Sequence, residues 1–129
     1  MKISYKQNMP IVRIIVKGPK GEEEYDAYLD TGASKCLIPE KDAKEIGLPY
    51  AGDIEVITGI GKDYIRLYNA TVIFLDKEFT ALVFTRDLPE QAVVKAIVGR
   101  EHLTLWVNYE KNISNTLKNI FLTTWKKWV

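Results

Sequence analysis

Short apolar runs separated by closely spaced turn signals are the feature that most constrains this fold. Runs rich in β-branched and aromatic residues cover residues 11–16, 23–29, 53–58, 64–75, 78–84 and 96–99. Between them stand turn-forming segments such as Gly18-Pro19-Lys20-Gly21 and Asp76-Lys77. Strands at this spacing are typical of an all-β barrel or sandwich. We therefore expect an all-β domain in which residues 11–29 form a hairpin that ends at Asp30.

A few segments depart from the strand pattern. Residues 39–47 predict a short helix, because Pro39 suits its first turn and Gly47 its end. Residues 100–105 predict the opening of a second helix, and residues 86–95 predict a surface loop with a helical turn. The chain has 129 residues without a repeat or linker, so we expect one domain over residues 1–129.

Charge and composition argue against several classes of protein. The formal net charge of +1 gives no general attraction to nucleic acid or membrane. No apolar run approaches the ~20 residues of a membrane-spanning helix, and the start has no signal-peptide pattern. One cysteine, Cys36, and one histidine, His102, make a disulfide framework or zinc site implausible. We expect a cytoplasmic protein without metal or cofactor, in which both residues are structural.

The tail is basic and aromatic, ending in Trp125-Lys126-Lys127-Trp128-Val129. Such a segment can pack on its own domain, which is the simplest interpretation. Among functional interpretations, contact with a partner subunit is favoured over contact with a membrane surface or nucleic acid.

The main chemical feature is the segment Ala27-Tyr28-Leu29-Asp30-Thr31-Gly32-Ala33-Ser34. An apolar strand leads directly to a carboxylate, which places a reactive group on a rigid element. Gly32 lets backbone N–H groups approach that carboxylate, since no Cβ intervenes. Ser34 offers a further donor, and Thr31 can hydrogen-bond across a symmetric interface. Taken alone, Asp-Thr-Gly also fits a strand that ends in an ordinary Asx turn.

Two later segments add to this motif in a fixed order. They are the glycine-rich Val56-Ile57-Thr58-Gly59-Ile60-Gly61-Lys62 and the apolar Ala96-Ile97-Val98-Gly99-Arg100-Glu101-His102-Leu103. Together the three segments resemble those of retropepsin-like (retroviral-type) aspartic proteases. The resemblance implies a closed β-barrel-like acid-protease fold with one or two short helices, assembled as a homodimer.

The resemblance also assigns roles to residues. It implies catalytic roles for Asp30, Thr31 and Gly32. It implies that the loop and the tip of a flexible flap bind the substrate, through Ala33, Ser34, Thr58, Gly59, Ile60 and Gly61. It implies structural support from Gly99 and Arg100. Retroviral proteases usually have an Asp where Ser34 stands, so Arg100 is expected to pair with another acid or with the partner chain. The region after Leu103 is also longer than is usual in that family.

A single Asp-Thr-Gly predicts two copies of the chain. Aspartic proteases use two carboxylates, and none of the other aspartates is followed by Thr-Gly or Ser-Gly. A two-fold axis would place a second Asp30 opposite the first. The predicted function is an endopeptidase acting on peptide or protein substrates. The alternative is a dimerisation or peptide-binding module that retains the fold without cleaving.

Two other interpretations fit the residues less well. Thr58-Gly59-Ile60-Gly61-Lys62 lacks the upstream glycine of a phosphate-binding loop, and Asp63 stands where Ser or Thr should follow the lysine. An aspartate at a strand end also occurs in phosphoryl-transfer folds, but those need alternating helices.

Overall fold

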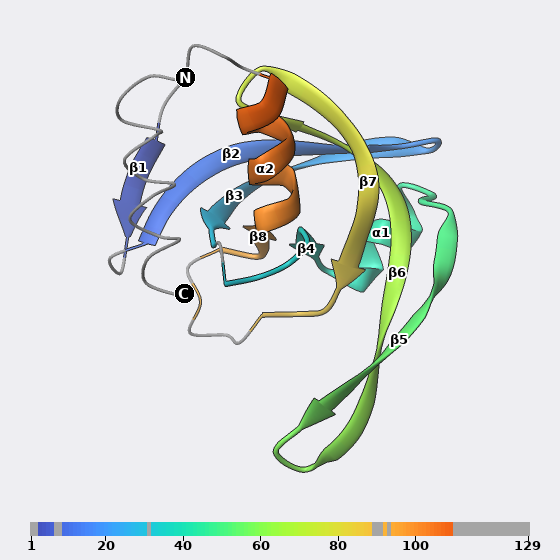
Figure 1. Cartoon of the computed structure of the whole chain (residues 1–129). Coiled ribbons are helices and arrows are strands. Elements are labelled where there is room, and N and C mark those ends of the chain that lie inside the picture. Colours follow the sequence, from blue (N-terminus) through green and yellow to red (C-terminus); the bar gives the residue numbers. More distant parts are fainter. Residues whose placement is uncertain (1–2, 7–8, 31, 89–91, 93, 110–129) are drawn as a thin grey trace.

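The computed structural model describes residues 3–6, 9–30, 32–88, 92 and 94–109 (Figure 1). This part of the chain forms eight strands and two helices. The strands are β1 (Ile3–Lys6), β2 (Met9–Gly18), β3 (Gly21–Leu29), β4 (Leu37–Ile38), β5 (Tyr50–Thr58), β6 (Gly61–Phe74), β7 (Lys77–Thr85) and β8 (Ala96–Val98). The helices are α1 (Glu40–Glu45) and α2 (Arg100–Tyr109).

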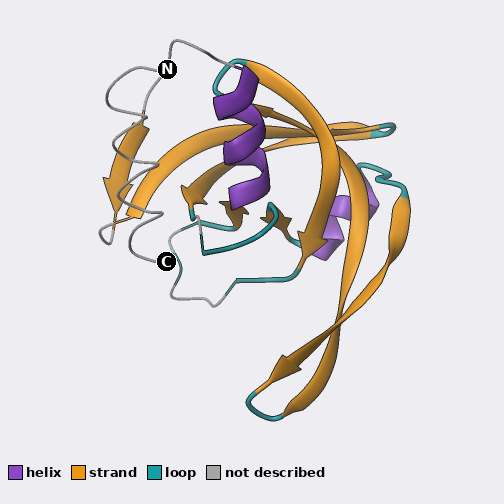
Figure 2. Ribbon diagram, viewed as in Figure 1, coloured by secondary structure: helices purple, strands orange, loops and turns teal. Residues whose placement is uncertain are grey.

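Six of the described strands close into a barrel. The pairing runs β2-β3-β8-β4-β7-β6, and β6 pairs again with β2. β2–β3 and β6–β7 are antiparallel hairpins, whereas β3–β8 and β4–β7 are parallel. β1 and β5 extend the sheet beyond β2 and β6 (Figure 2). This architecture confirms the predicted closed, mostly β fold with two short helices.

Side chains that alternate between buried and more exposed positions along β2 and β6 form the centre of the core. Ile14 lies opposite Phe74 and Val16 opposite Val72, and all four side chains are fully buried. Their neighbours along each strand are more exposed, as expected for strands with one face in the core. The core therefore fixes the register of these strands and, through the β2–β3 hairpin, the position at which β3 ends.

The predicted strands and helices are present, with shifted ends and two additions. β1 and the two-residue β4 were not predicted, because four and two residues carry too little pattern. The turn before β7 lies at Leu75 and Asp76, one residue earlier than predicted, and both have positive φ (50° and 65°). A two-residue hairpin turn demands this conformation; Leu75 adopts it with its side chain buried.

Some predictions concern residues outside the described part of the chain. The described residues of the segment 86–95 form an irregular connection, and residues 89–91 and 93 lie outside that part, so the helical turn predicted within this segment stays a prediction. The basic, aromatic tail and Thr31 also lie outside it. In the described residues, no helix is both long enough and apolar enough to cross a membrane.

Candidate active site

Asp30 lies immediately after β3, at the point where the chain leaves the barrel. Leu29 pairs with Val98 of β8, and the Asp30 amide donates to the Val98 carbonyl at 3.0 Å. Leu29 is buried, whereas Asp30 is partly exposed. The backbone of this residue is therefore fixed by the barrel, while its carboxylate can reach solvent or a substrate.

The carboxylate is oriented by the loop that follows it. The Gly32 amide donates to Asp30 Oδ1 at 2.9 Å, and the Ala33 amide donates to the Asp30 carbonyl at 3.1 Å. The first of these bonds is that of an Asx turn, so by itself it does not separate a reactive carboxylate from a structural one. The structure beneath the loop is more informative.

Gly99 and the start of α2 support the loop from below. β8 lies between β3 and β4 in the barrel, which places Gly99 under the segment that joins those two strands. A Cβ on Gly99 would lie 2.3 Å from the Lys35 carbonyl oxygen and 2.7 Å from the Lys35 amide nitrogen. Because both atoms belong to the backbone, only glycine fits there without moving the loop.

The first amides of α2 bind carbonyls of the same loop. The Arg100 amide donates to the Ala33 carbonyl at 2.7 Å, and the Glu101 amide donates to the Ser34 carbonyl at 3.0 Å. These amides have no acceptor within the helix, so the loop satisfies them. The structure thus brings Asp30, Gly32, Ala33 and Ser34 close to Gly99 and Arg100. The sequence had suggested that these two segments belong to one site.

An ion pair that the sequence did not predict joins the same two segments. Lys35 Nζ contacts a carboxylate oxygen of Glu101 in the first turn of α2. The Lys35 side chain is 24% exposed and that of Glu101 is 39% exposed. Their positions directly after Ser34 and Arg100 were the only sequence signal of a contact.

The two residues that were expected to be structural are buried beside this loop. Burial raises the pKa of the Cys36 thiol to about 12, which leaves it protonated and a poor nucleophile. His102 is fully buried, and burial lowers the pKa of its imidazole. It packs edge-on against Phe79, and neither ring nitrogen has a hydrogen-bond partner among the described residues.

The glycine-rich segment forms the tip of the β5–β6 hairpin. Thr58 pairs with Gly61, which leaves Gly59 and Ile60 as a two-residue turn; Gly61 has φ 128°. The Thr58 side chain lies outside the described part of the structure. Ile60 is completely exposed (101%), and the hairpin projects from the barrel (Figures 1 and 2). The tip of this hairpin, which is the predicted flap, is therefore not packed over Asp30.

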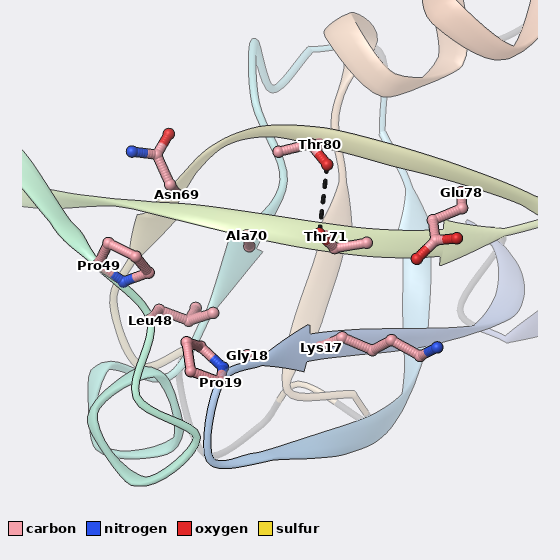
Figure 3. A pocket seen from close by; sticks show the side chains of 10 residues that line it. All are labelled: Lys17, Gly18, Pro19, Leu48, Pro49, Asn69, Ala70, Thr71, Glu78 and Thr80. Carbon is pink, nitrogen blue, oxygen red and sulfur yellow. Dashed lines mark hydrogen bonds between the residues drawn. The ribbon is translucent and has the colours of Figure 1, made fainter.

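A separate cavity of about 360 Å³ opens on another part of the barrel (Figure 3). Its lining comes from the end of β2, the segment before β5, and the paired strands β6 and β7: Lys17, Gly18, Pro19, Leu48, Pro49, Asn69, Ala70, Thr71, Glu78 and Thr80. None of the predicted site residues lines it. The candidate site is the loop after β3 together with the flap, and not this cavity.

Comparisons with known proteins bear on the family and the fold of the chain. The aspartyl protease family model matches residues 12–91, which include Asp30 and the flap. The EIAV protease complexed with the inhibitor HBY-793 is similar in structure, with a TM-score of 0.56 and 14% identity, covering 80% of this chain and 93% of that chain. The solution structure of the simian foamy virus (mac) protease gives a TM-score of 0.58 and 16% identity, covering 80% of this chain and 99% of that chain.

No match was found among curated protein sequences. At these identities, the likeness to the two viral proteases concerns the fold alone. The family model is the stronger finding, since it spans well over half of the 129 residues and includes the Asp-Thr-Gly segment. The chain therefore belongs to the aspartyl protease family.

Proposed function

We propose that the protein is an aspartic endopeptidase whose active site is completed by Asp30 from each of two identical chains. One observation carries the proposal: in a member of this family, the only Asp-Thr-Gly places a partly exposed carboxylate at the end of β3, with Gly32 donating to it. One carboxylate cannot act as base and acid at the same time. A second copy across a two-fold axis supplies the other.

The proposed chemistry follows from two carboxyl groups held close together. They share one proton, because both cannot ionise at low cost at short separation, as is known for aspartic proteases as a class. The ionised Asp30 takes a proton from a water molecule as its oxygen attacks the scissile carbonyl carbon. The protonated Asp30 of the partner subunit donates a hydrogen bond to the carbonyl oxygen.

The tetrahedral intermediate then breaks down. The C–N bond breaks, the departing nitrogen receives a proton from the dyad, and the new carboxyl group leaves with the other product. Water is the nucleophile throughout, so no acyl-enzyme forms. Because activity needs one proton on the pair, neither two nor none, the rate should follow a bell-shaped pH profile.

The flap and the catalytic loop are the proposed peptide-binding surfaces. Backbone groups of Gly32 and of the flap tip can pair with an extended peptide as an added strand. Gly59 has no atom within 4 Å of the position of a Cβ, and Ile60 is fully exposed, so the tip has room to move over a bound peptide. Closure would exclude water and complete the site.

Substitution of Asp30 tests the proposal. Asp30→Asn should abolish cleavage of casein or a peptide library, because asparagine cannot act as the base, while the dimer remains intact by analytical ultracentrifugation. Asp26→Asn is the matched control: Asp26 lies on β3, shortly before Asp30, is exposed, and pairs with Arg13 at 2.9 Å. It should cleave as the wild type does.

The same pair of variants separates the enzyme from a non-cleaving module. Cleavage by the wild type that is lost in Asp30→Asn, and that a statine-type transition-state mimic inhibits, supports the enzyme. A wild type that binds peptides without cleaving any of them between mildly acidic and neutral pH would instead support the binding module. Unchanged cleavage by Asp30→Asn would refute the proposed mechanism.

A further inference from the structure

The flap leaves the barrel at a defined point. β6 pairs with β7 as far as Arg66, which lies opposite Thr85, the last residue of β7. From residue 65 to residue 61, the only described pairing of β6 is with β5. We call residues 54–65 the distal part of the flap, and Arg66 and Asp53 its root.

Among the described residues, one ion pair joins the barrel to the distal part of the flap. Arg86 follows β7 directly, and its Nη2 lies 2.6 Å from Asp63 Oδ2. The Arg86 amide donates to the Ile38 carbonyl at 3.0 Å, which fixes its backbone to β4. A charge-assisted hydrogen bond this short is among the stronger surface contacts. Movement of the flap away from the barrel would break it.

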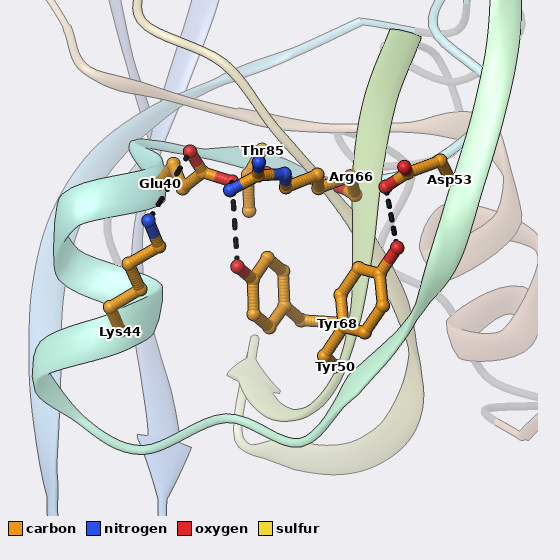
Figure 4. Close-up of polar contacts among 7 residues, drawn as sticks. All are labelled: Glu40, Lys44, Tyr50, Asp53, Arg66, Tyr68 and Thr85. Atoms are coloured by element: carbon orange, nitrogen blue, oxygen red, sulfur yellow. Dashed lines mark hydrogen bonds and ion pairs between the residues drawn. The ribbon is translucent and has the colours of Figure 1, made fainter.

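A second group of contacts holds the root (Figure 4). Arg66 Nη1 lies 3.4 Å from Glu40 Oε2, and Tyr68 Oη donates to the same oxygen at 3.4 Å. The Glu40 carboxylate raises the pKa of the Arg66 guanidinium, which keeps that side chain charged. Lys44 Nζ lies 3.8 Å from the other Glu40 oxygen and helps to hold the carboxylate on α1.

The two groups of contacts act on opposite faces of β6. Successive side chains of a strand point to opposite faces, so Arg66 and Tyr68 share one face and Asp63 lies on the other. The barrel residues of the two groups, Glu40 and Arg86, both lie close to Ile38. Glu40 follows Ile38 by two residues, and the Arg86 amide donates to the Ile38 carbonyl. We call the ion pairs Arg86–Asp63 and Glu40–Arg66 the clamp.

β5 has an irregularity at the same level. Gly52 lies at a register shift in the β5–β6 pairing, has φ 128°, and has no atom within 4 Å of the position of a Cβ. Bulges of this kind bend a strand locally. A bend at Gly52 would move the distal part of the flap as one body and would strain both ion pairs of the clamp.

We propose that Glu40 and Arg86 are positioning residues that set the angle of the flap over the active site, with Gly52 as the hinge. The inference rests on the proposed function in one respect, namely that this hairpin covers the peptide. The loop that carries Asp30 continues into β4, so Asp30 and the clamp share an anchor. Because the ion pairs are exposed, salt screens them, and the flap angle responds to ionic strength.

A distance measurement tests the clamp without any substrate. Nitroxide labels are placed at Ile60→Cys on the flap tip and Glu22→Cys on the barrel, while the buried Cys36 stays unlabelled. The labelled chain is mixed with an excess of unlabelled chain, so that distances within one chain dominate. Double electron–electron resonance should give one narrow distance distribution for the doubly labelled parent. Arg86→Gln or Glu40→Gln should broaden that distribution.

The flap itself offers a matched control, and charge reversal offers a rescue. Lys62 Nζ lies 3.2 Å from Glu55 Oε1, an exposed ion pair within the flap that does not reach the barrel. Glu55→Gln should therefore leave the distribution narrow. The double variant Asp63→Arg with Arg86→Asp should restore it, because the pair is reversed but present.

Peptide cleavage gives a second readout. A flap that is less often in place lowers apparent substrate affinity but does not change the closed complex, so Arg86→Gln should raise KM about two- to five-fold. Its kcat should stay within about two-fold of the wild type. Added NaCl should raise KM of the wild type toward that of the variant and affect the variant less.

The proposed function and the proposed clamp can be refuted independently of each other. Absence of cleavage in every form would count against the proposed function, and the distance measurement would still decide the clamp. Distributions that are equally narrow in the parent, Arg86→Gln and Glu40→Gln would overturn the clamp. So would broadening in Glu55→Gln as large as that in Arg86→Gln.

Discussion

The loop that carries Asp30 and the β5–β6 hairpin, which is the proposed flap, are held to the same barrel by different kinds of contact. The loop is fixed by backbone hydrogen bonds from β8 and α2 and by the absence of a side chain at Gly99. The hairpin is held by exposed side-chain ion pairs, Glu40–Arg66 at its root and Arg86–Asp63 beyond the root, and its tip residue Ile60 is fully exposed. The proposed function accounts for this difference, because a catalytic carboxylate needs a fixed position whereas a cover over the substrate must move.

This contrast also separates stability from activity. Backbone contacts in the loop do not depend on salt or on the ionisation of side chains, and changing them should disturb the fold. The flap buries little, so changes there should alter substrate binding and leave the unfolding free energy nearly unchanged.

The largest expected effect compares one substitution at two glycines. Gly99→Ala places a Cβ 2.3 Å from the Lys35 carbonyl oxygen, whereas at Gly59 no atom lies within 4 Å of that position. We expect Gly99→Ala to lower the unfolding free energy by about 2–4 kcal/mol and to abolish cleavage. Gly59→Ala should change it by at most about 0.5 kcal/mol. Urea unfolding at one fixed protein concentration measures both.

If Gly99→Ala unfolds at the same urea concentration as Gly59→Ala, the loop is not held by close backbone packing. The contrast between the two regions would then be lost. A cleavage-competent Gly99→Ala would lead to the same conclusion, since the loop that carries Asp30 would tolerate displacement.

The next prediction concerns the pH dependence of stability and His102, which is buried beside the loop that carries Asp30. Burial lowers the pKa of His102 below its ordinary value of 6.5, so the unfolded chain binds this proton more readily than the folded chain does. The stabilisation from a neutral His102 is complete above about pH 6.5 and falls as pH drops toward the folded pKa, by at most about 1.4 kcal/mol per pH unit.

His102→Leu should remove that part of the pH dependence. It replaces a buried ring without hydrogen-bond partners among the described residues by an apolar side chain of similar size. Urea unfolding from pH 5 to pH 8 should then give a shallower slope below pH 6.5 than the wild type gives. Equal slopes would mean that His102 titrates alike in both states.

A smaller effect concerns the ion pair between the catalytic loop and α2. Lys35→Met and Glu101→Gln should each lower stability by up to about 1 kcal/mol, and the double variant by less than the sum. A double-mutant cycle in urea gives the coupling energy. If the coupling vanishes, the ion pair adds nothing to the backbone contacts, and the loop depends on those alone.

The smallest effect on stability is expected at the flap tip. Ile60→Ala removes a side chain that is fully exposed, so the unfolding free energy should change by less than about 0.5 kcal/mol. KM for a peptide should nevertheless rise, because the proposed contact with substrate is lost. A loss of stability without a change in KM would show that Ile60 packs against protein instead.

Much of the fold could be predicted because the signals are local. Runs of β-branched and aromatic residues and the turn-forming residues 18–21 predicted the strands and the first hairpin, and Pro39 and Gly47 marked the two ends of α1. β4 could not be predicted, because its two residues are a strand only through pairing with Phe84, Thr85 and Ile97. The closure of the barrel through β2 and β6 is likewise a long-range contact without a local pattern.

The candidate site divides in a similar way. Asp30, Gly32 and Gly99 stand in motifs that could be identified in the sequence, and the structure brings their segments together. The Lys35–Glu101, Arg86–Asp63 and Glu40–Arg66 pairs join residues far apart in the chain. Charged surface residues are numerous, so which of them meet is decided by the fold.

A mixing experiment tests the central claim most directly. Wild-type chain and Asp30→Asn are co-refolded in different ratios at constant total concentration, and cleavage of one peptide is followed. If each active site needs Asp30 from two chains, activity should fall with the square of the wild-type fraction, to about one quarter in an equal mixture. A linear fall, to about one half in that mixture, would show that a single chain carries the whole active site.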